Sequence, residues 1–165
     1  MGLNSSILLL SLIEDILDLS KIDAGTFSIN ISNFNLSDLI DEVYDVYHFQ
    51  CLEKKLRLEV DIEPCLEQFF ISSDRGRIKQ VLLNLISNSF KFTFEGMIKL
   101  SISIIRVRRK EYINFIVEDT GIGIKQEDQD KLFKLFGMII NEESKENRYS
   151  NLNPNGCGIG LNVCK

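Results

Sequence analysis

The sequence predicts a mixed α/β fold, and three observations lead to that prediction. Segments with apolar residues at helical spacing alternate along the chain with short runs rich in Ile and Val. At 165 residues the chain is long enough to bury one hydrophobic core. A hydrophobic content of 44% with 26% charged residues is ordinary for a globular domain. We therefore expect one main domain in which helices pack against a sheet.

The first predicted element is an amphipathic helix over residues 5–23. Leu12, Ile16 and Leu19 follow helical spacing with acidic residues between them, and Gly25 follows as a stop signal. A helix this short and amphipathic favours a partner helix, and packing against its own domain is the alternative.

A strand and a second helix are predicted next. Phe27, Ile29 and Ile31 alternate with polar residues, as in a half-buried strand. Helical spacing returns over residues 36–54, with Asn35, Ser37 and Asp38 as signals of a helix N-terminus. This part of the chain therefore predicts a strand that leads into a helix.

Two short strands and the longest helix follow. The strands are expected over residues 56–62 and 69–72, and the helix over residues 75–92, where apolar residues lie along one face. Asp74 stands directly before that helix as a natural N-cap.

A hairpin is predicted from two runs rich in Ile and Val, over residues 97–107 and 112–118. The runs are joined through a basic cluster made of Arg106, Arg108, Arg109 and Lys110. We interpret this cluster as a solvated hairpin tip and not as a phosphate-binding patch. The net charge of −5 likewise argues against nucleic acid as a partner.

The composition predicts a cytoplasmic domain without direct membrane contact. The longest apolar runs are far shorter than the ~20 residues of a membrane-spanning helix, and the N-terminus lacks the pattern of a signal peptide. The four cysteines form no CxxC pair, which favours reduced thiols over a zinc site. A membrane anchor elsewhere in a parent protein is compatible with these observations.

The longest predicted helix carries the first group of candidate binding residues. Asn84 and Asn88 are four residues apart and Lys91 is three further, so the three side chains project from one face. A carboxamide oxygen is a suitable ligand for Mg²⁺, and a lysine suits a phosphate. The alternative interpretation is an ordinary solvated helix face.

The second group of candidates follows the hairpin. Asp119 stands directly after a predicted strand, before Gly121 and Gly123. The glycines allow backbone with positive φ and the close approach of a planar ligand, and the carboxylate can accept a hydrogen bond from an exocyclic amine. Asp and Gly also form ordinary turns, which is the alternative here.

The third group lies near the end of the chain. A polar stretch over residues 141–155 is long for a compact domain and is interpreted as either disordered or a functional lid. A glycine-rich loop then leads into a predicted helix and supplies backbone amides for an anion. The residues of this loop are Gly156, Gly158, Gly160 and Leu161. The loop is not a Walker motif, and it lacks the context of a dinucleotide-binding fold.

Taken in order, these motifs resemble the histidine kinase branch of the superfamily that also holds Hsp90, DNA gyrase B and MutL. Four stretches resemble the N box, first glycine box, F box and second glycine box of that branch: DRGRIKQVLLNLISNSFKFT, VEDTGIGI, KLFKLF and GCGIGL. Upstream, LLSLIEDILDLSKIDAG resembles the end of the second helix of the dimerisation domain.

The resemblance implies a fold and a domain organisation. The fold is a two-layer Bergerat-type sandwich, in which helices cover one face of a mixed, mostly antiparallel sheet. Residues 1–25 correspond to the end of a dimerisation and histidine-phosphotransfer helix, and residues 26–165 to an ATP-binding catalytic domain. In the family this domain continues beyond Lys165, so we expect the domain to be incomplete at its C-terminal end.

The resemblance also implies a role for each candidate residue. Asn88, assisted by Asn84, is expected to coordinate Mg²⁺, and Lys91 to contact the phosphates of ATP. Asp119 is expected to bind the adenine amine. The remaining family positions are Gly121 and Gly123 at the floor of the site, Phe133 and Phe136 in the lid, and Gly156, Gly158, Gly160 and Leu161 along the triphosphate.

The implied function is phosphoryl transfer in a two-component system. The family members that hydrolyse ATP have, at the position that resembles Asn84, a Glu that activates water. The carboxamide of Asn84 cannot take a proton from water in this way. The expected acceptor is therefore a histidine outside this chain, and then a response-regulator Asp. His48 lacks the sequence context of an acceptor, and we expect it to be structural. The expected partners are the histidine-bearing dimerisation domain, a second copy of the parent protein and a receiver domain.

The chain departs from the family pattern at three positions. Lys134 and Leu135 replace an acidic residue and Pro in the F box, and Cys157 replaces a small hydroxyl residue in the last glycine box. These departures leave open a second hypothesis, in which the chain is a non-catalytic scaffold that binds ATP or dimerises within a signalling protein. An ATPase of the gyrase or Hsp90 kind is disfavoured by Asn84.

Overall fold

The computed structural model describes residues 13, 16–18, 20–22, 24–129 and 164. Ile29–Gly123 form one compact unit, and the described residues on either side belong to another. No helix in the described part of the chain combines the length and the apolarity needed to cross a membrane.

The N-terminal helix ends where the sequence predicts. Residues 13, 16–18 and 20–22 are helical. Gly25 has φ +66, and the Thr26 N–H donates to the Lys21 carbonyl over 2.9 Å. The Gly25 N–H donates to the Ile22 carbonyl over 3.0 Å. These two bonds form a Schellman motif, which needs a left-handed residue and so explains the glycine.

The first strand begins later than predicted. Strand β1 spans Ser32–Asn35 and pairs antiparallel with β3, Phe70–Ser73. Residues 27–31 are not in a strand, and both Ile29 and Ile31 are exposed. The predicted strand over Phe27 to Ile31 is therefore wrong, because β3 pairs only with the four residues that follow Ile31 in the chain.

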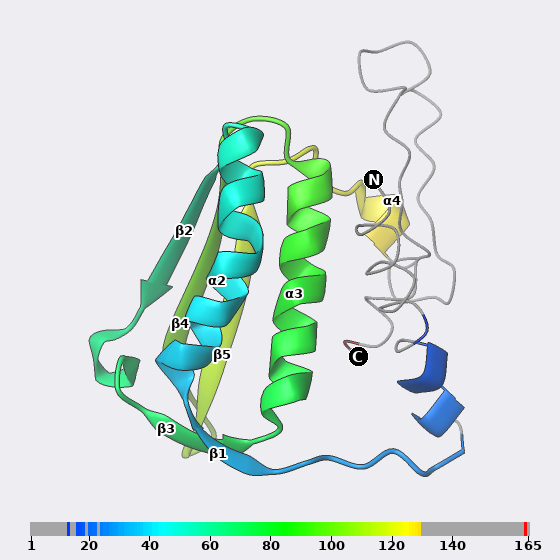
Figure 1. The fold of residues 1–165 in the computed structure, drawn as a ribbon, viewed down its shortest axis with the longest axis vertical. Coiled ribbons are helices and arrows are strands. Elements are labelled where there is room, and N and C mark those ends of the chain that lie inside the picture. Colours follow the sequence, from blue (N-terminus) through cyan, green and yellow to red (C-terminus); the bar gives the residue numbers. More distant parts are fainter. Residues whose placement is uncertain (1–12, 14–15, 19, 23, 130–163, 165) are drawn as a thin grey trace. The chain divides into compact units, whose positions relative to one another are not determined.

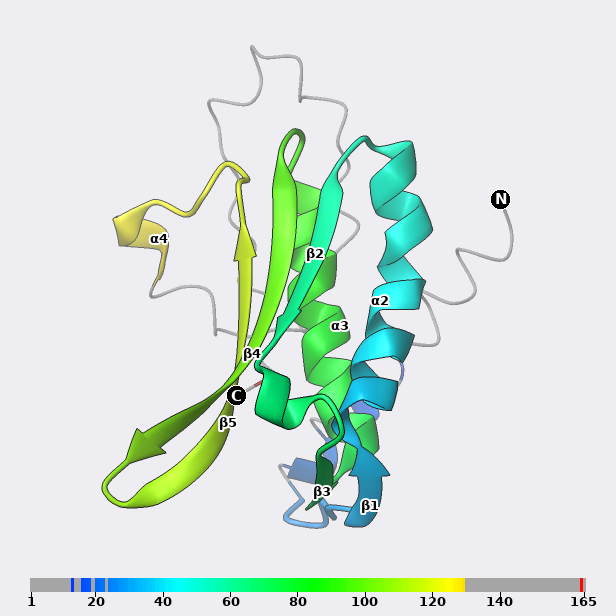
Figure 2. The same ribbon diagram turned by 90° about the vertical axis from the view of Figure 1, so that its left-hand side faces the viewer.

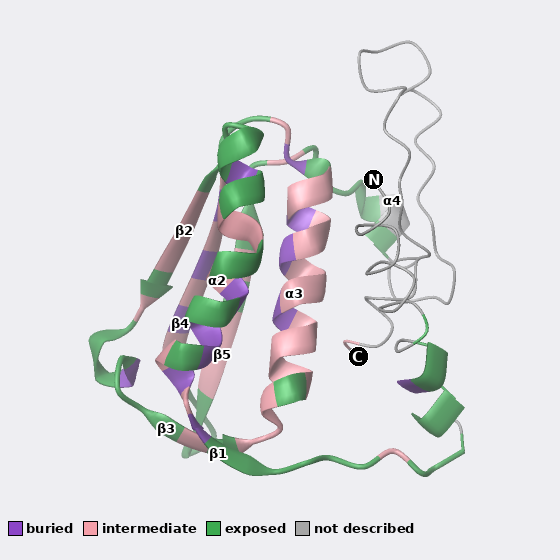
Figure 3. Ribbon diagram, in the orientation of Figure 1, coloured by how far each residue is buried: buried purple, intermediate pink, exposed green. Residues whose placement is uncertain are grey.

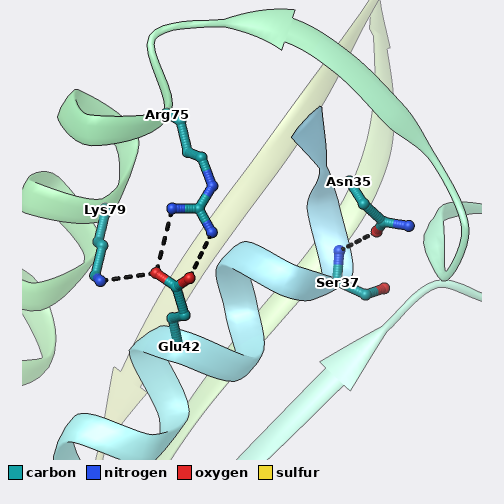
Figure 4. Close-up of polar contacts among 5 residues, drawn as sticks. All are labelled: Asn35, Ser37, Glu42, Arg75 and Lys79. Atoms are coloured by element: carbon teal, nitrogen blue, oxygen red, sulfur yellow. Dashed lines mark hydrogen bonds and ion pairs between the residues drawn. The ribbon is translucent and has the colours of Figure 1, made fainter. Parts of the chain in front are cut away.

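Both long helices begin at the predicted caps. Helix α2 spans Leu36–Glu53, and the Asn35 side chain accepts a hydrogen bond from the Ser37 N–H over 2.8 Å (Figure 4). Helix α3 spans Arg75–Phe92, and Asp74 accepts from a backbone N–H in its first turn. Each cap satisfies one of the N–H groups that a helix start leaves without an intrahelical partner.

A three-stranded sheet forms the second layer. Its strands are β2, Arg57–Ile62, β4, Met97–Val107, and β5, Lys110–Asp119, in the order β2-β4-β5. β2 runs parallel to β4, and β4 and β5 form the predicted antiparallel hairpin. Arg108 and Arg109 have φ values of 50 and 68, as a two-residue turn requires. The basic cluster thus lies at the hairpin tip, as predicted.

Helices α2 and α3 lie side by side on one face of this sheet (Figures 1 and 2). The buried residues gather where the helices and the sheet face each other (Figure 3). The main core cluster is Leu36, Ile40, Val43, Leu66, Leu82, Ile86, Leu100 and Ile102. Two short elements complete the described chain, the 3-10 turn η1 at Pro64–Leu66 and α4 at Gln126–Gln129. The mixed α/β fold with helices on one face is confirmed.

An ion-pair cluster joins the two long helices at the surface. The Glu42 carboxylate of α2 accepts from Arg75 Nη2 over 2.8 Å and from Lys79 Nζ over 2.8 Å, both on α3 (Figure 4). The hydrogen bonds from Arg75, and then those from Lys79, lower the pKa of Glu42 from its ordinary value of 4.5 to about 2.

This depressed pKa predicts a pH dependence of stability. Because the folded state favours the charged carboxylate, the contribution of Glu42 is present above pH 4.5 and is lost as the pH falls towards 2. We expect Glu42→Gln to be less stable than the wild type at pH 7 in urea unfolding. The difference should shrink between pH 4.5 and 2. The same substitution at the exposed Glu95 is the control, and a difference independent of pH would contradict the assignment.

Candidate functional site

The second half of α3 presents three of the predicted site residues on one stripe. Asn84, Asn88 and Lys91 are all half-buried. They lie on the side of the helix away from Leu82 and Ile86, which are buried in the core. Within the part of the chain that the structure describes, the side-chain amide of Asn88 has no hydrogen-bond partner. The stripe thus offers carboxamide and ammonium groups from a rigid helix.

The Asp119 carboxylate lies at the end of β5 and is held by α3. Ser89 Oγ donates a hydrogen bond to Asp119 Oδ2 over 2.8 Å. The Gly121 N–H donates to Asp119 Oδ1 over 2.9 Å. Asp119 is nevertheless exposed, so the carboxylate retains acceptor capacity for a ligand. Asp119 is thus bonded to the residue that directly follows Asn88 on α3.

The two glycines after Asp119 are required for different reasons. A Cβ atom added at Gly121 would lie 2.5 Å from the Phe92 carbonyl oxygen and 2.8 Å from Asp119 Oδ1. Gly123 instead has φ +66, with open space around the position of its Cβ. Only the second glycine therefore meets the expectation of positive φ, and the first permits a close approach to the C-terminal end of α3.

Thr120 fixes the same turn to the start of β4. Its backbone N–H donates to the Met97 carbonyl over 3.1 Å, and its hydroxyl donates to the Glu95 carbonyl over 3.0 Å. Gly96 has φ +103, and a Cβ atom there would collide with the Thr120 hydroxyl. These contacts anchor the segment that carries Asp119 without using Asp119 itself.

Sequence reasoning missed two buried hydroxyl residues, Ser89 on α3 and Thr93 at the C-cap of that helix. Ser89 and Thr93 continue the buried stripe of Leu82 and Ile86, at 6% and 0% exposure. The Thr93 hydroxyl has no hydrogen-bond partner among the described residues. A hydroxyl in an apolar stripe is the signal that could have identified both, because a buried polar group is costly unless it is paired.

Several predicted site residues lie outside the described part of the chain. They are Phe133, Phe136, Gly156, Gly158, Gly160 and Leu161. His48 is described, and its ring stacks on Tyr44 at 4.7 Å between centroids. That contact within α2 agrees with a structural role for His48.

The described residues fit a ligand with two chemically distinct ends. The carboxylate of Asp119 is complementary to an N–H donor, and the amide oxygens of Asn84 and Asn88 are hard ligands suited to a cation such as Mg²⁺. The ammonium of Lys91, in the last turn of α3, suits an anion and is also favoured by the helix dipole.

The chain has close relatives among sensor kinases. It is 37% identical over 152 residues to the aerobic respiration control sensor protein ArcB homolog of Haemophilus influenzae, covering 92% of this chain and 43% of that protein. It is 39% identical over 163 residues to hybrid signal transduction histidine kinase B of Dictyostelium discoideum, covering 95% and 8%. The chain thus spans less than half the length of these curated relatives.

Solved structures resemble the chain over most of its length. The structure of full-length ShkA in complex with AMPPNP superimposes with a TM-score of 0.71 at 25% identity, covering 94% of this chain and 29% of that one. Histidine kinase ThkA in complex with response regulator protein TrrA superimposes with a TM-score of 0.51 at 26% identity, covering 76% and 36%.

The family assignment rests on the half of the chain that holds the candidate site. Residues 73–165 match the family described as histidine kinase-, DNA gyrase B- and HSP90-like ATPase. This range begins one residue before the Asp74 cap and includes α3 and the Asp119 turn, and its length exceeds half of the chain. The chain therefore belongs to the histidine kinase-, DNA gyrase B- and HSP90-like ATPase family.

Proposed function

We propose that this chain is the ATP-binding catalytic domain of a two-component sensor histidine kinase. It transfers the γ-phosphate of ATP to a histidine outside the chain, from which the phosphoryl group passes to a response-regulator Asp. The observation that carries this proposal is the hydrogen bond of 2.8 Å between Ser89 and Asp119. It joins the carboxylate suited to adenine to the helix that carries Asn88, directly before Ser89.

ATP and Mg²⁺ are assigned to the described residues as follows. Asp119 accepts a hydrogen bond from the adenine amine, beside Gly121 and Gly123. Asn88, assisted by Asn84, holds Mg²⁺, which when bound neutralises charge on the phosphates. Two observations support Mg²⁺ at this position. Carboxamide oxygens are suitable ligands for the ion, and the side-chain amide of Asn88 forms no hydrogen bond with a described residue. Lys91 contacts the phosphates as a point charge.

The family positions beyond the described residues complete the proposal. Phe133 and Phe136 pack the lid over the nucleotide. The loop along the triphosphate consists of Gly156, Gly158, Gly160 and Leu161.

Transfer to a protein is favoured over hydrolysis because of Asn84. A carboxamide cannot act as the general base that would activate water. The contribution of this domain is then to position ATP and to neutralise the developing charge. Binding of adenine at Asp119 fixes one end of the nucleotide while the stripe on α3 fixes the other.

The proposed partners follow from the parent protein. We infer that residues 1–25 correspond to the end of a dimerisation helix and residues 26–165 to the catalytic domain, and that the parent is a homodimer through that helix. This domain lies in the cytoplasm, and a membrane anchor elsewhere in the parent is compatible with this assignment. The domain meets the histidine-bearing dimerisation domain of the same protein and a receiver domain. The complex of ThkA with a response regulator supports the last of these.

A non-catalytic ATP-binding scaffold is the second candidate. The replacement of the usual acidic residue and Pro by Lys134 and Leu135 favours it, because these positions belong to the F box. A folded chain that binds ATP but never phosphorylates its own dimerisation domain would identify the scaffold.

Calorimetric titration of ATP tests the nucleotide site. We expect the purified chain to bind ATP more tightly with Mg²⁺ than without it. Asp119→Asn should weaken binding by about tenfold or more, since the amide replaces one acceptor oxygen with a donor. Asp61→Asn, at an exposed carboxylate paired with Lys99 on the sheet, is the matched control and should bind as the wild type does. A folded wild-type chain without affinity for ATP would contradict the proposal.

A further inference from the structure

Ser89 is a buried hydroxyl with a directed contact. Its side chain comes from the stripe of α3 that packs into the core, and the residue is only 6% exposed. Its hydroxyl donates a hydrogen bond to Asp119 Oδ2 over 2.8 Å and so links α3 to the end of β5, which is distant in sequence. A serine at such a position without a partner would be destabilising, so the contact with Asp119 accounts for it.

The Asp119 carboxylate is held from two sides. Oδ2 accepts from Ser89 on α3, and Oδ1 accepts from the Gly121 N–H in the following turn. Because these donors belong to different elements, rotation of the carboxylate about its own bonds breaks at least one hydrogen bond. Asp119 is exposed, yet its orientation is fixed before a ligand arrives.

The fixed carboxylate presents only acceptors to a ligand. Ser89 has one hydroxyl proton, and it is used on Asp119, so only the lone pairs of its oxygen remain. The Gly121 N–H is used in the same way. This edge of the site therefore favours a ligand group that donates hydrogen bonds and disfavours one that accepts them.

We propose that Ser89 is a positioning residue that makes this site selective for 6-amino purine nucleotides over 6-oxo purine nucleotides. The inference rests on the proposed function and deepens it. A 6-oxo purine places an acceptor against the acceptors of Asp119, and a carboxylate that could turn away would relieve that repulsion. Ser89 prevents the carboxylate from turning, so a 6-oxo purine faces the fixed oxygens of Asp119 without a hydrogen bond between them and binds more weakly.

The test compares the affinities of ATP and inosine triphosphate, each with Mg²⁺, for the full chain and its variants. In the wild type we expect ATP to bind more tightly. In Ser89→Ala the ratio of the two dissociation constants should fall by about tenfold, because the carboxylate gains freedom to turn. Ser87→Ala is the matched control, since Ser87 lies on the same helix but bonds Tyr47 of α2, and its ratio should equal that of the wild type.

The outcomes separate this inference from the proposed function. If the wild type binds neither nucleotide, both fail. If the wild type prefers ATP and Ser89→Ala keeps the same ratio with an unchanged melting temperature, only the role of Ser89 is overturned. Should Ser89→Ala not fold, Ser89→Cys keeps a similar volume with a weaker donor. Its ratio should also fall, and an unchanged ratio overturns the inference.

Discussion

Replacing Asn88 by Ala is expected to remove the magnesium dependence of ATP binding. The affinity measured with Mg²⁺ should fall by about 100-fold, to the level that the wild type shows without the ion. The physical reason is that Asn88 offers a carboxamide oxygen from a half-buried position on a rigid helix, and alanine offers none. Calorimetric titration with and without Mg²⁺ measures the effect directly.

Two further variants sharpen this prediction. Asn84→Ala should lose a smaller part of the magnesium dependence, because Asn84 assists one turn earlier on the same face of α3. Asn33→Ala, at an exposed residue of β1, is the matched control and should behave as the wild type does. If Asn88→Ala retained wild-type affinity and its dependence on Mg²⁺, the cation would have to be held elsewhere.

The helices could be predicted from the sequence almost to the residue because their signals are local. Asn35 and Asp74 cap the first turns of α2 and α3 through side chains that reach only two or three residues along the chain. The Schellman motif at Gly25 is equally local. Each of these features is complete within one turn of helix, so the sequence alone contains the information.

The predicted strand over residues 27–31 failed because strand pairing is not local. Alternation of Phe27, Ile29 and Ile31 is what a half-buried strand shows, but a strand also needs a ladder partner. In the structure the Asn30 N–H donates to Asp74 Oδ2 over 2.8 Å, and no strand pairs with it. Nothing in the sequence of this segment distinguishes a carboxylate partner from a neighbouring strand.

In the candidate site, too, local features could be predicted from the sequence and contacts between distant residues could not. Asp119 and its glycines could be found from the motif, because spacing along the chain defines them. The reason for Gly121 could not, since the atom that excludes a side chain is the carbonyl oxygen of Phe92, on another element. Ser89 was missed for a related reason. A serine in an apolar stripe indicates that a hydrogen-bond partner is needed, but its partner Asp119 is distant in sequence and could not be identified from the stripe.

Replacing Gly121 by Ala is expected to damage both the fold and the site. The new Cβ would lie 2.5 Å from the Phe92 carbonyl oxygen, a backbone atom that cannot move without shifting the end of α3. It would also lie 2.8 Å from Asp119 Oδ1, the atom to which the Gly121 N–H donates. Overpacking against fixed atoms typically costs about 1–3 kcal/mol. Because the carboxylate must move, ATP affinity should fall by about 100-fold.

Two other glycines separate this effect from the general cost of adding a methyl group. Gly76 lies in the first turn of α3, where a Cβ would meet only Asp74 Oδ1 at 3.5 Å. Gly76→Ala should therefore stabilise the protein by up to about 1 kcal/mol. Gly123→Asn should be tolerated, because asparagine accepts a positive φ and space is open there. Urea unfolding measures all three, and a Gly121→Ala variant as stable as the wild type would mean that the turn after β5 can shift away from α3.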